Sequence, residues 1–143
     1  MKKMNVLVLA FGIFFASCGE DDFTLIGDIN CEVPGIVDQD QFSNESSDGF
    51  DIDDVQLDED CLAILFGAGG CSGDTWELKL LGSEATTFSE PPQRSIRLVL
   101  KDDEECEAYI EQIVSFDISD FKVPGGDVIL ILEGYDEQIL VED

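Results

Sequence analysis

Residues 75–81 read TWELKLL, and residues 95–101 read SIRLVLK. In both stretches apolar and polar side chains alternate, so that Trp76, Leu78 and Leu80 share one side. A period of two is typical of a β-strand that buries one face and exposes the other. The two stretches therefore predict neighbouring strands of a sheet, joined by the long loop between them.

The same alternation recurs along the chain from Phe50 onward, in runs separated by turn residues. Val128–Leu132 is apolar on both faces, as expected for a central strand, and Gln138–Val141 forms a last run. Seven or eight short strands of this kind predict an all-β fold, an antiparallel β-sandwich. An immunoglobulin-like arrangement is one form that this sandwich could take.

Residues 107–119 fit two structures. Acidic residues before Ala108 could begin a helix. The alternation that places Ile110, Val114, Phe116 and Ile118 on one side instead favours a strand.

The N-terminus has the pattern of an export signal. Lys2 and Lys3 precede an apolar run too short to span a bilayer, and Ala16 and Ser17 come just before Cys18. This resembles a bacterial lipobox, with Phe15 where leucine is usual. The resemblance implies cleavage after residue 17 and acylation of Cys18, with palmitate-type chains anchoring the protein to a membrane. The alternatives are an uncleaved apolar anchor and a plain secretory signal with a chance cysteine.

The region after the signal is strongly acidic. Residues 19–60 contain 15 acidic residues and no basic one. Residues 18–49 are therefore expected to form an acidic tether or N-terminal extension, and residues 50–143 the sandwich domain. An acidic run directly after the lipidated cysteine also resembles the signal that sends Bacteroidetes lipoproteins through the outer membrane to the cell surface.

The charge of the chain limits its partners. It has 7 Lys and Arg against 33 Asp and Glu, a net charge of −26, and two of its cations leave with the signal. Nucleic acids and anionic lipids require basic residues, so the charge excludes them as ligands. Cations, basic proteins and neutral glycans remain, unless the charge serves only solubility.

The cysteines predict two disulfides. An exported chain with an even number of cysteines after Cys18 is expected to oxidise them, and without histidine or C-x₂-C spacing they do not resemble a metal site. If the two quoted strands pair antiparallel, Cys106 approaches Cys71. Cys31–Cys61 then follows by elimination, and the alternative pairing is Cys31–Cys71 with Cys61–Cys106.

One acidic stretch has oxygen ligands at calcium-like spacing. Asp48, Asp51 and Asp53 lie close together, and residues 44–49 match the first half of an EF-hand loop. Val55 stands where a closing glutamate is needed. One alternative function is thus that of a calcium-stabilised structural protein of the envelope. The simpler interpretation of this stretch is an acidic segment exposed to solvent.

Two residues are candidates for ligand contact. Arg94 is a cation in an acidic field, in the loop region of residues 89–94, and Tyr135 follows Gly134 in an expected hairpin. A glycan or a protein is the expected ligand class.

The sequence offers no catalytic constellation. The absence of histidine excludes Ser-His-Asp, Cys-His and HExxH arrangements. The glycine-rich residues 67–74 lack the lysine of a phosphate-binding loop. A hydrolase with paired carboxylates is a second alternative, but 33 acidic residues make such pairs unspecific. We therefore expect a protein that is not an enzyme and needs no cofactor.

Three stretches suggest a family: residues 70–76, residues 91–98 and residues 132–135. Together they resemble a group of small uncharacterised lipoproteins from Bacteroidetes, chiefly flavobacteria. The resemblance implies a source and an envelope location, but no activity. The sequence thus predicts a surface or periplasmic lipoprotein that acts as a non-catalytic binding or accessory module.

Overall fold

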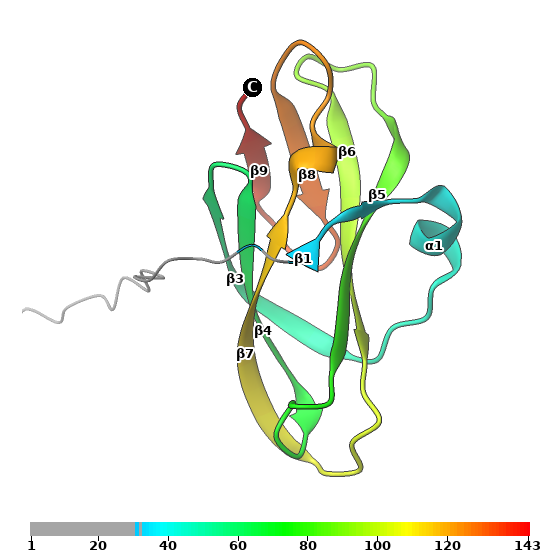
Figure 1. Ribbon diagram of the computed structural model, residues 1–143, viewed down its shortest axis with the longest axis vertical. Helices are drawn as coiled ribbons and strands as arrows, with labels where there is room; N and C mark the ends of the chain where they lie inside the picture. The colour runs from blue at the N-terminus through cyan, green and yellow to red at the C-terminus, as the bar shows by residue number, and fades with distance from the viewer. Residues whose placement is uncertain (1–30, 32) are drawn as a thin grey trace, which may run out of the picture.

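Two β-sheets face each other around one apolar core in the computed structural model, which describes residue 31 and residues 33–143 (Figure 1). The four-stranded sheet has the order β1-β7-β4-β3, and the five-stranded sheet has the order β2-β5-β6-β8-β9. The all-β sandwich is confirmed. The elements are β1 (Val33–Pro34), β2 (Ile36–Val37), α1 (Gln39–Asn44), β3 (Phe50–Asp58), β4 (Cys61–Gly70), β5 (Glu77–Thr86), β6 (Gln93–Lys101), β7 (Ala108–Asp117), η1 (Ser119–Phe121), β8 (Val128–Leu132) and β9 (Gln138–Val141).

The two quoted stretches form the centre of the five-stranded sheet. β5 pairs antiparallel with β6, and Leu80, Ile96 and Leu100 point inward and are fully buried. β7 confirms the strand prediction for residues 108–117. Three pairings are parallel: β1 with β7, β2 with β5, and β6 with β8. The strand order therefore departs from that of immunoglobulin domains.

A bulge in β3 changes which residues face the core. The ladder with β4 shifts between Ile52 and Asp54, so Asp53 is an extra residue without a partner across the strand pair. Phe50 packs against the core before the bulge, and Val55 does so after it. The bulge lets inward-facing residues change from even to odd numbers.

The segment before residue 50 belongs to the sandwich. β1 lies beside β7, Gly35 donates its N–H to Asp117 O at 2.7 Å, and β2 then joins the other sheet beside β5. From Val33 onward, the expected acidic tether or N-terminal extension is therefore joined to both sheets by backbone pairing. No helix among the described residues has the length and apolar character needed to cross a membrane.

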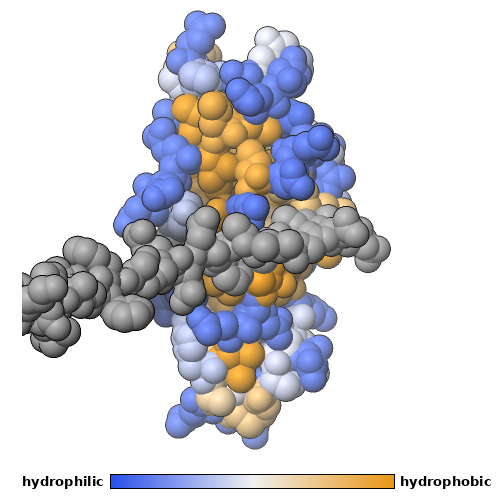
Figure 2. Space-filling view, turned by 90° about the vertical axis from the view of Figure 1, so that its left-hand side faces the viewer, coloured by the Kyte–Doolittle hydropathy of each residue, from blue (hydrophilic) through white to orange (hydrophobic). Residues whose placement is uncertain are grey.

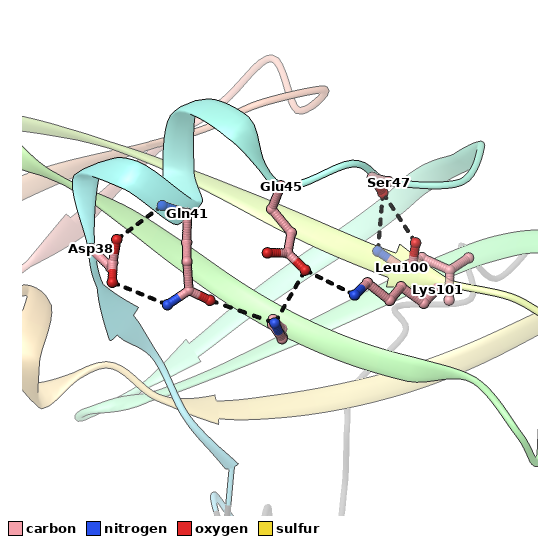
Figure 3. Close-up of polar contacts among 7 residues, drawn as sticks. Asp38, Gln41, Glu45, Ser47, Leu100 and Lys101 are labelled. Atoms are coloured by element: carbon pink, nitrogen blue, oxygen red, sulfur yellow. Dashed lines mark hydrogen bonds and ion pairs between the residues drawn. The ribbon is translucent and has the colours of Figure 1, made fainter.

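Helix α1 packs on the outer face of β5. Asp38 caps it by accepting the N–H of Gln41 at 2.9 Å. Glu45, just beyond the helix, pairs with Lys79 at 3.2 Å and Lys101 at 3.0 Å (Figure 3). These contacts hold the acidic N-terminal segment against the basic side chains of the sheet.

Both predicted disulfides are present. Cys31–Cys61 joins the N-terminal segment to the start of β4, with the Cα atoms 5.6 Å apart. Cys71–Cys106 joins the loops that follow β4 and β6, with the Cα atoms 4.8 Å apart. The antiparallel pairing of β5 with β6, with Lys101 opposite Glu77, brings the loop that holds Cys106 toward Cys71, as predicted.

Candidate functional site

A gap along the edge of β6 forms the best candidate site. The ladder between β6 and β8 ends where Glu133 donates its N–H to Ile96 O at 2.9 Å. Further along the same edge, Asp48 donates its N–H to Leu100 O at 2.9 Å. Alternate residues of a strand direct their backbone groups to the same side, so the N–H and C=O of Leu98 face the space between these two partners.

This space is a pocket of about 390 Å³, which we call the edge pocket. It lies between the crossover into β3, the middle of β6 and the turn after β8. Its lining consists of Ser47, Asp48, Gly49, Phe50, Asp51, Ile52, Arg97, Leu98, Glu133 and Gly134.

Arg97 supplies the positive charge of the edge pocket. Its Nη1 donates to Phe42 O of helix α1 at 3.0 Å, and its Nε lies 3.6 Å from Glu133 Oε2. The Nε–H is buried and makes no hydrogen bond to any part of the chain that the structure describes. Helix α1 and Glu133 thus fix the guanidinium at the wall of the edge pocket.

Acceptors line the rest of the pocket. Asp48 accepts the N–H of Asp102 at 2.8 Å through Oδ2, and Asp51 is exposed on β3. A carboxylate has about four lone-pair sites, so both can accept further hydrogen bonds. Donors and acceptors together suit a hydroxyl-rich, uncharged ligand.

The structure places Tyr135 next to this pocket. It follows Gly134, whose φ of 84° makes the turn, and its N–H binds Leu132 O at 3.1 Å. The ring is half-buried and packs against the core rather than standing free. Its burial raises the pKa of the hydroxyl, and the negative charges of Glu137 and Asp54 add to this effect.

Arg94 is buried and bonded to backbone carbonyls within the protein. Its residue is only 7% exposed, and its guanidinium donates to Phe121 O at 2.9 Å, to Ser83 O and to Glu84 O at 3.4 Å. Arg94, a candidate for ligand contact from its sequence position, instead lies on the inward side of β6, where its donors are used within the protein. Burial also lowers the pKa of its guanidinium.

The calcium candidates are only partly brought together. Asp48 and Asp51 share the edge pocket, whereas Asp53 lies on the bulge of β3 and does not line it. Among the described residues no three acidic or cysteine side chains converge as metal ligands. Helix α1 ends at Asn44, the first residue of the EF-hand-like half-loop.

The glycine-rich loop binds an anion from within the chain. The carboxylate of Glu104 accepts the N–H groups of Cys71, Ser72 at 2.9 Å and Gly73 at 3.1 Å, and the hydroxyl of Thr75 at 3.0 Å. Those backbone bonds, that of Gly73 first, lower the pKa of Glu104 to about 2. The loop therefore braces the second disulfide, and an external phosphate would have to displace Glu104.

The cations of the described residues all have partners within the chain. Lys79 and Lys101 pair with Glu45, Lys122 pairs with Asp60, and the two arginines are held as described above. On the side where Figure 1 draws β3, β4 and β7, hydrophilic residues border an apolar band (Figure 2). Because these cations are paired within the chain, the unpaired charge on the protein surface comes from carboxylates.

Comparisons with known proteins support the fold alone. No protein-family model matches the chain, and no curated protein sequence matches it. A solved structure with a similar fold is that of a protein of unknown function, DUF1344, from Bacteroides vulgatus, with a TM-score of 0.50 and 16% identity. The similarity covers 79% of this chain and 56% of that protein, so the chain spans little more than half of its length.

Sequence reasoning missed several residues of the edge pocket. It identified Asp48 and Asp51 but not Arg97, Glu133 or the backbone edge at Leu98. The signal for Arg97 was its place on the polar side of the alternating strand, yet the gap beside it depends on where β8 ends. Cys18 lies outside the described residues, and its lipidation stays a prediction.

Proposed function

We propose that this protein is an exported, lipid-anchored binding module of the bacterial envelope that holds an uncharged glycan without changing it chemically. The edge pocket carries the proposal, because it combines the guanidinium of Arg97, the backbone of Leu98 and several carboxylates. A sugar hydroxyl can donate one hydrogen bond and accept others, and this pocket lining offers both acceptors and donors.

The charge of the protein supports an uncharged ligand. Anionic polymers would meet a surface whose cations are already paired, and repulsion would slow their approach. The calcium-stabilised alternative has less support, since three carboxylates do not converge among the described residues. No arrangement of side chains in residues 33–143 favours the hydrolase.

Binding can be tested by filling the pocket. Gly49 lines the pocket, and an added Cβ there meets no atom within 4 Å, so Gly49→Trp adds a bulky side chain at the pocket wall without a clash. The matched control is Gly126→Trp, since Gly126 also has open space but lies in the turn before β8. Calorimetry with cellotetraose, mannotetraose, xylotetraose and laminaritetraose should show binding of at least one to wild type and to the control, and loss of that binding in Gly49→Trp.

Two outcomes would contradict glycan binding in this pocket. Either none of the four oligosaccharides binds wild-type protein, or Gly49→Trp binds as tightly as wild type. Equal thermal midpoints for the two tryptophan variants would show that any loss is not caused by unfolding.

Anchoring by lipid requires a separate test. The 13 residue steps from Cys18 to Cys31 can span at most about 45 Å, which would keep the domain close to the membrane. Cells expressing the full chain should incorporate labelled palmitate and retain the protein in the membrane fraction. Cys18→Ala should abolish both; unchanged labelling of this variant would refute the assignment.

A further inference from the structure

Tyr109 forms an aromatic platform on the outer face of the four-stranded sheet. It projects from β7 opposite Gly69 and is 58% exposed. An added Cβ at Gly67 would collide with the hydroxyl and ring carbons of Tyr109. The ring therefore lies across the backbone of Gly67, with its other side free.

Two glycines of β4 make this arrangement possible. Gly67 is buried beneath the ring, and a side chain there would push the ring off the sheet. Gly69 is exposed, and a Cβ there would meet nothing within 4 Å. The sheet is thus bare beside the ring, leaving room for a flat ligand.

Hydrogen-bond acceptors flank the platform. The register places Asp51 of β3 and Glu111 of β7 on either side of Gly67. Partial burial raises the pKa of the Tyr109 hydroxyl, and the negative charges of Asp53, Asp51 and Glu111 add to this rise. An aromatic face bordered by carboxylates matches a sugar ring, whose C–H groups lie flat and whose hydroxyls project sideways.

Asp51 connects this platform to the edge pocket. It lines the pocket and is also paired with Gly67, over which the tyrosine lies. Neighbouring strands are about 4.8 Å apart, so the ring over β4 is one strand spacing from the pocket wall on β3. Sugar units bound at the two places would be close enough to belong to one chain.

We infer that Tyr109 is a stacking subsite for a neutral oligosaccharide whose neighbouring units occupy the edge pocket. This inference rests on the proposed function and extends it, since it identifies the ligand as a glycan chain rather than a single sugar. The ring face supplies contact area, and Asp51 and Glu111 accept hydrogen bonds from hydroxyls at its rim.

The test uses three variants and the four oligosaccharides named above, with their monosaccharides, in calorimetry. Tyr109→Ala removes the ring, and Tyr109→Phe keeps it without the hydroxyl. Ile113→Ala is the matched control, because Ile113 is 45% exposed on the same face of the same strand. Tyr109→Ala should weaken tetrasaccharide binding by about tenfold or more, as truncation of an aromatic anchor does. Tyr109→Phe and Ile113→Ala should bind within about twofold of wild type.

The outcomes separate the two proposals. If Gly49→Trp abolishes binding while Tyr109→Ala does not weaken it, the pocket stands and the platform is refuted. Equal losses in Tyr109→Ala and Tyr109→Phe would refute stacking, because the hydroxyl would then be the essential group. If no oligosaccharide binds wild type, both proposals fail, and salt-sensitive binding of tetralysine would instead identify a cationic ligand.

Discussion

Glu104 shows how one carboxylate can organise a loop. It gathers three backbone N–H groups next to the Cys71–Cys106 disulfide, and these bonds hold its pKa at about 2, below the usual value near 4.5. A carboxylate with a lowered folded pKa stabilises the protein above its unfolded pKa. We therefore expect stability to fall as the pH is lowered from about 4.5 to about 2.

Glu104→Gln tests this expectation. The amide keeps one acceptor oxygen but loses the charge and the second acceptor, so the thermal midpoint at pH 7 should fall by a few degrees. The difference from wild type should shrink below pH 4 and vanish near pH 2. Glu105→Gln is the control, since Glu105 is the exposed next residue. A difference independent of pH would contradict the role of the charge.

Arg94 is a structural residue, and its replacement should cost stability rather than binding. Its guanidinium bridges Phe121 O and Ser83 O inside the protein, a geometry that a lysine cannot reproduce. Arg94→Lys should lower the free energy of unfolding by about 2 kcal/mol, the usual worth of charged hydrogen bonds. Urea titration would measure this loss. Weakened oligosaccharide binding by the folded variant would contradict a purely structural role.

At the level of elements, the N-terminal segment closes one edge of the sandwich. The chain passes from β1 on one sheet to β2 on the other at Gly35, where backbone lies against Phe121. A Cβ at Gly35 would come within 2.6 Å of Phe121 Cζ. The crossing thus depends on a glycine facing a fully buried aromatic ring.

Gly35→Ala should therefore destabilise the protein, by about 1–3 kcal/mol as for other overpacked cores. Phe121→Leu should also destabilise it, because it leaves a cavity. Combined, the two changes should cost less than the sum of the single losses, since the smaller leucine leaves space for the new methyl group. Chemical denaturation of all four proteins gives the coupling, and strictly additive losses would refute the contact.

The elements also show what sequence reasoning could predict. Alternation located β5, β6 and β7, because packing on one face leaves that pattern directly. The alternation also predicts that Arg94 faces inward, because Arg94 is in phase with Ile96 and Leu98, which are buried. The charge of Arg94 alone would suggest a place on the surface. The alternation could not predict the edge pocket, because this pocket forms where β8 ends beside the longer strand β6. Pairing of β1 and β2 depends on contacts with residues about 80 and 45 positions away, respectively.

For the whole molecule, the dominant feature is unbalanced charge. The sequence contains 33 acidic residues, and the structure shows four ion pairs among the described residues. Exposed ion pairs contribute about 0–1 kcal/mol each. Repulsion among the remaining carboxylates acts over the Debye length, which is about 30 Å at 0.01 M salt and 8 Å at 0.15 M. Screening should thus remove more repulsion than attraction.

Added salt is consequently expected to stabilise this protein. Raising NaCl from about 10 to 150 mM should increase the thermal midpoint by several degrees, because the folded state holds the carboxylates closer together than the unfolded chain. Choline chloride should act equally, since screening depends on ionic strength and not on the cation. A midpoint that falls with salt would mean that the pairs around Glu45 outweigh the net repulsion. A rise with sodium alone would indicate a specific cation site instead.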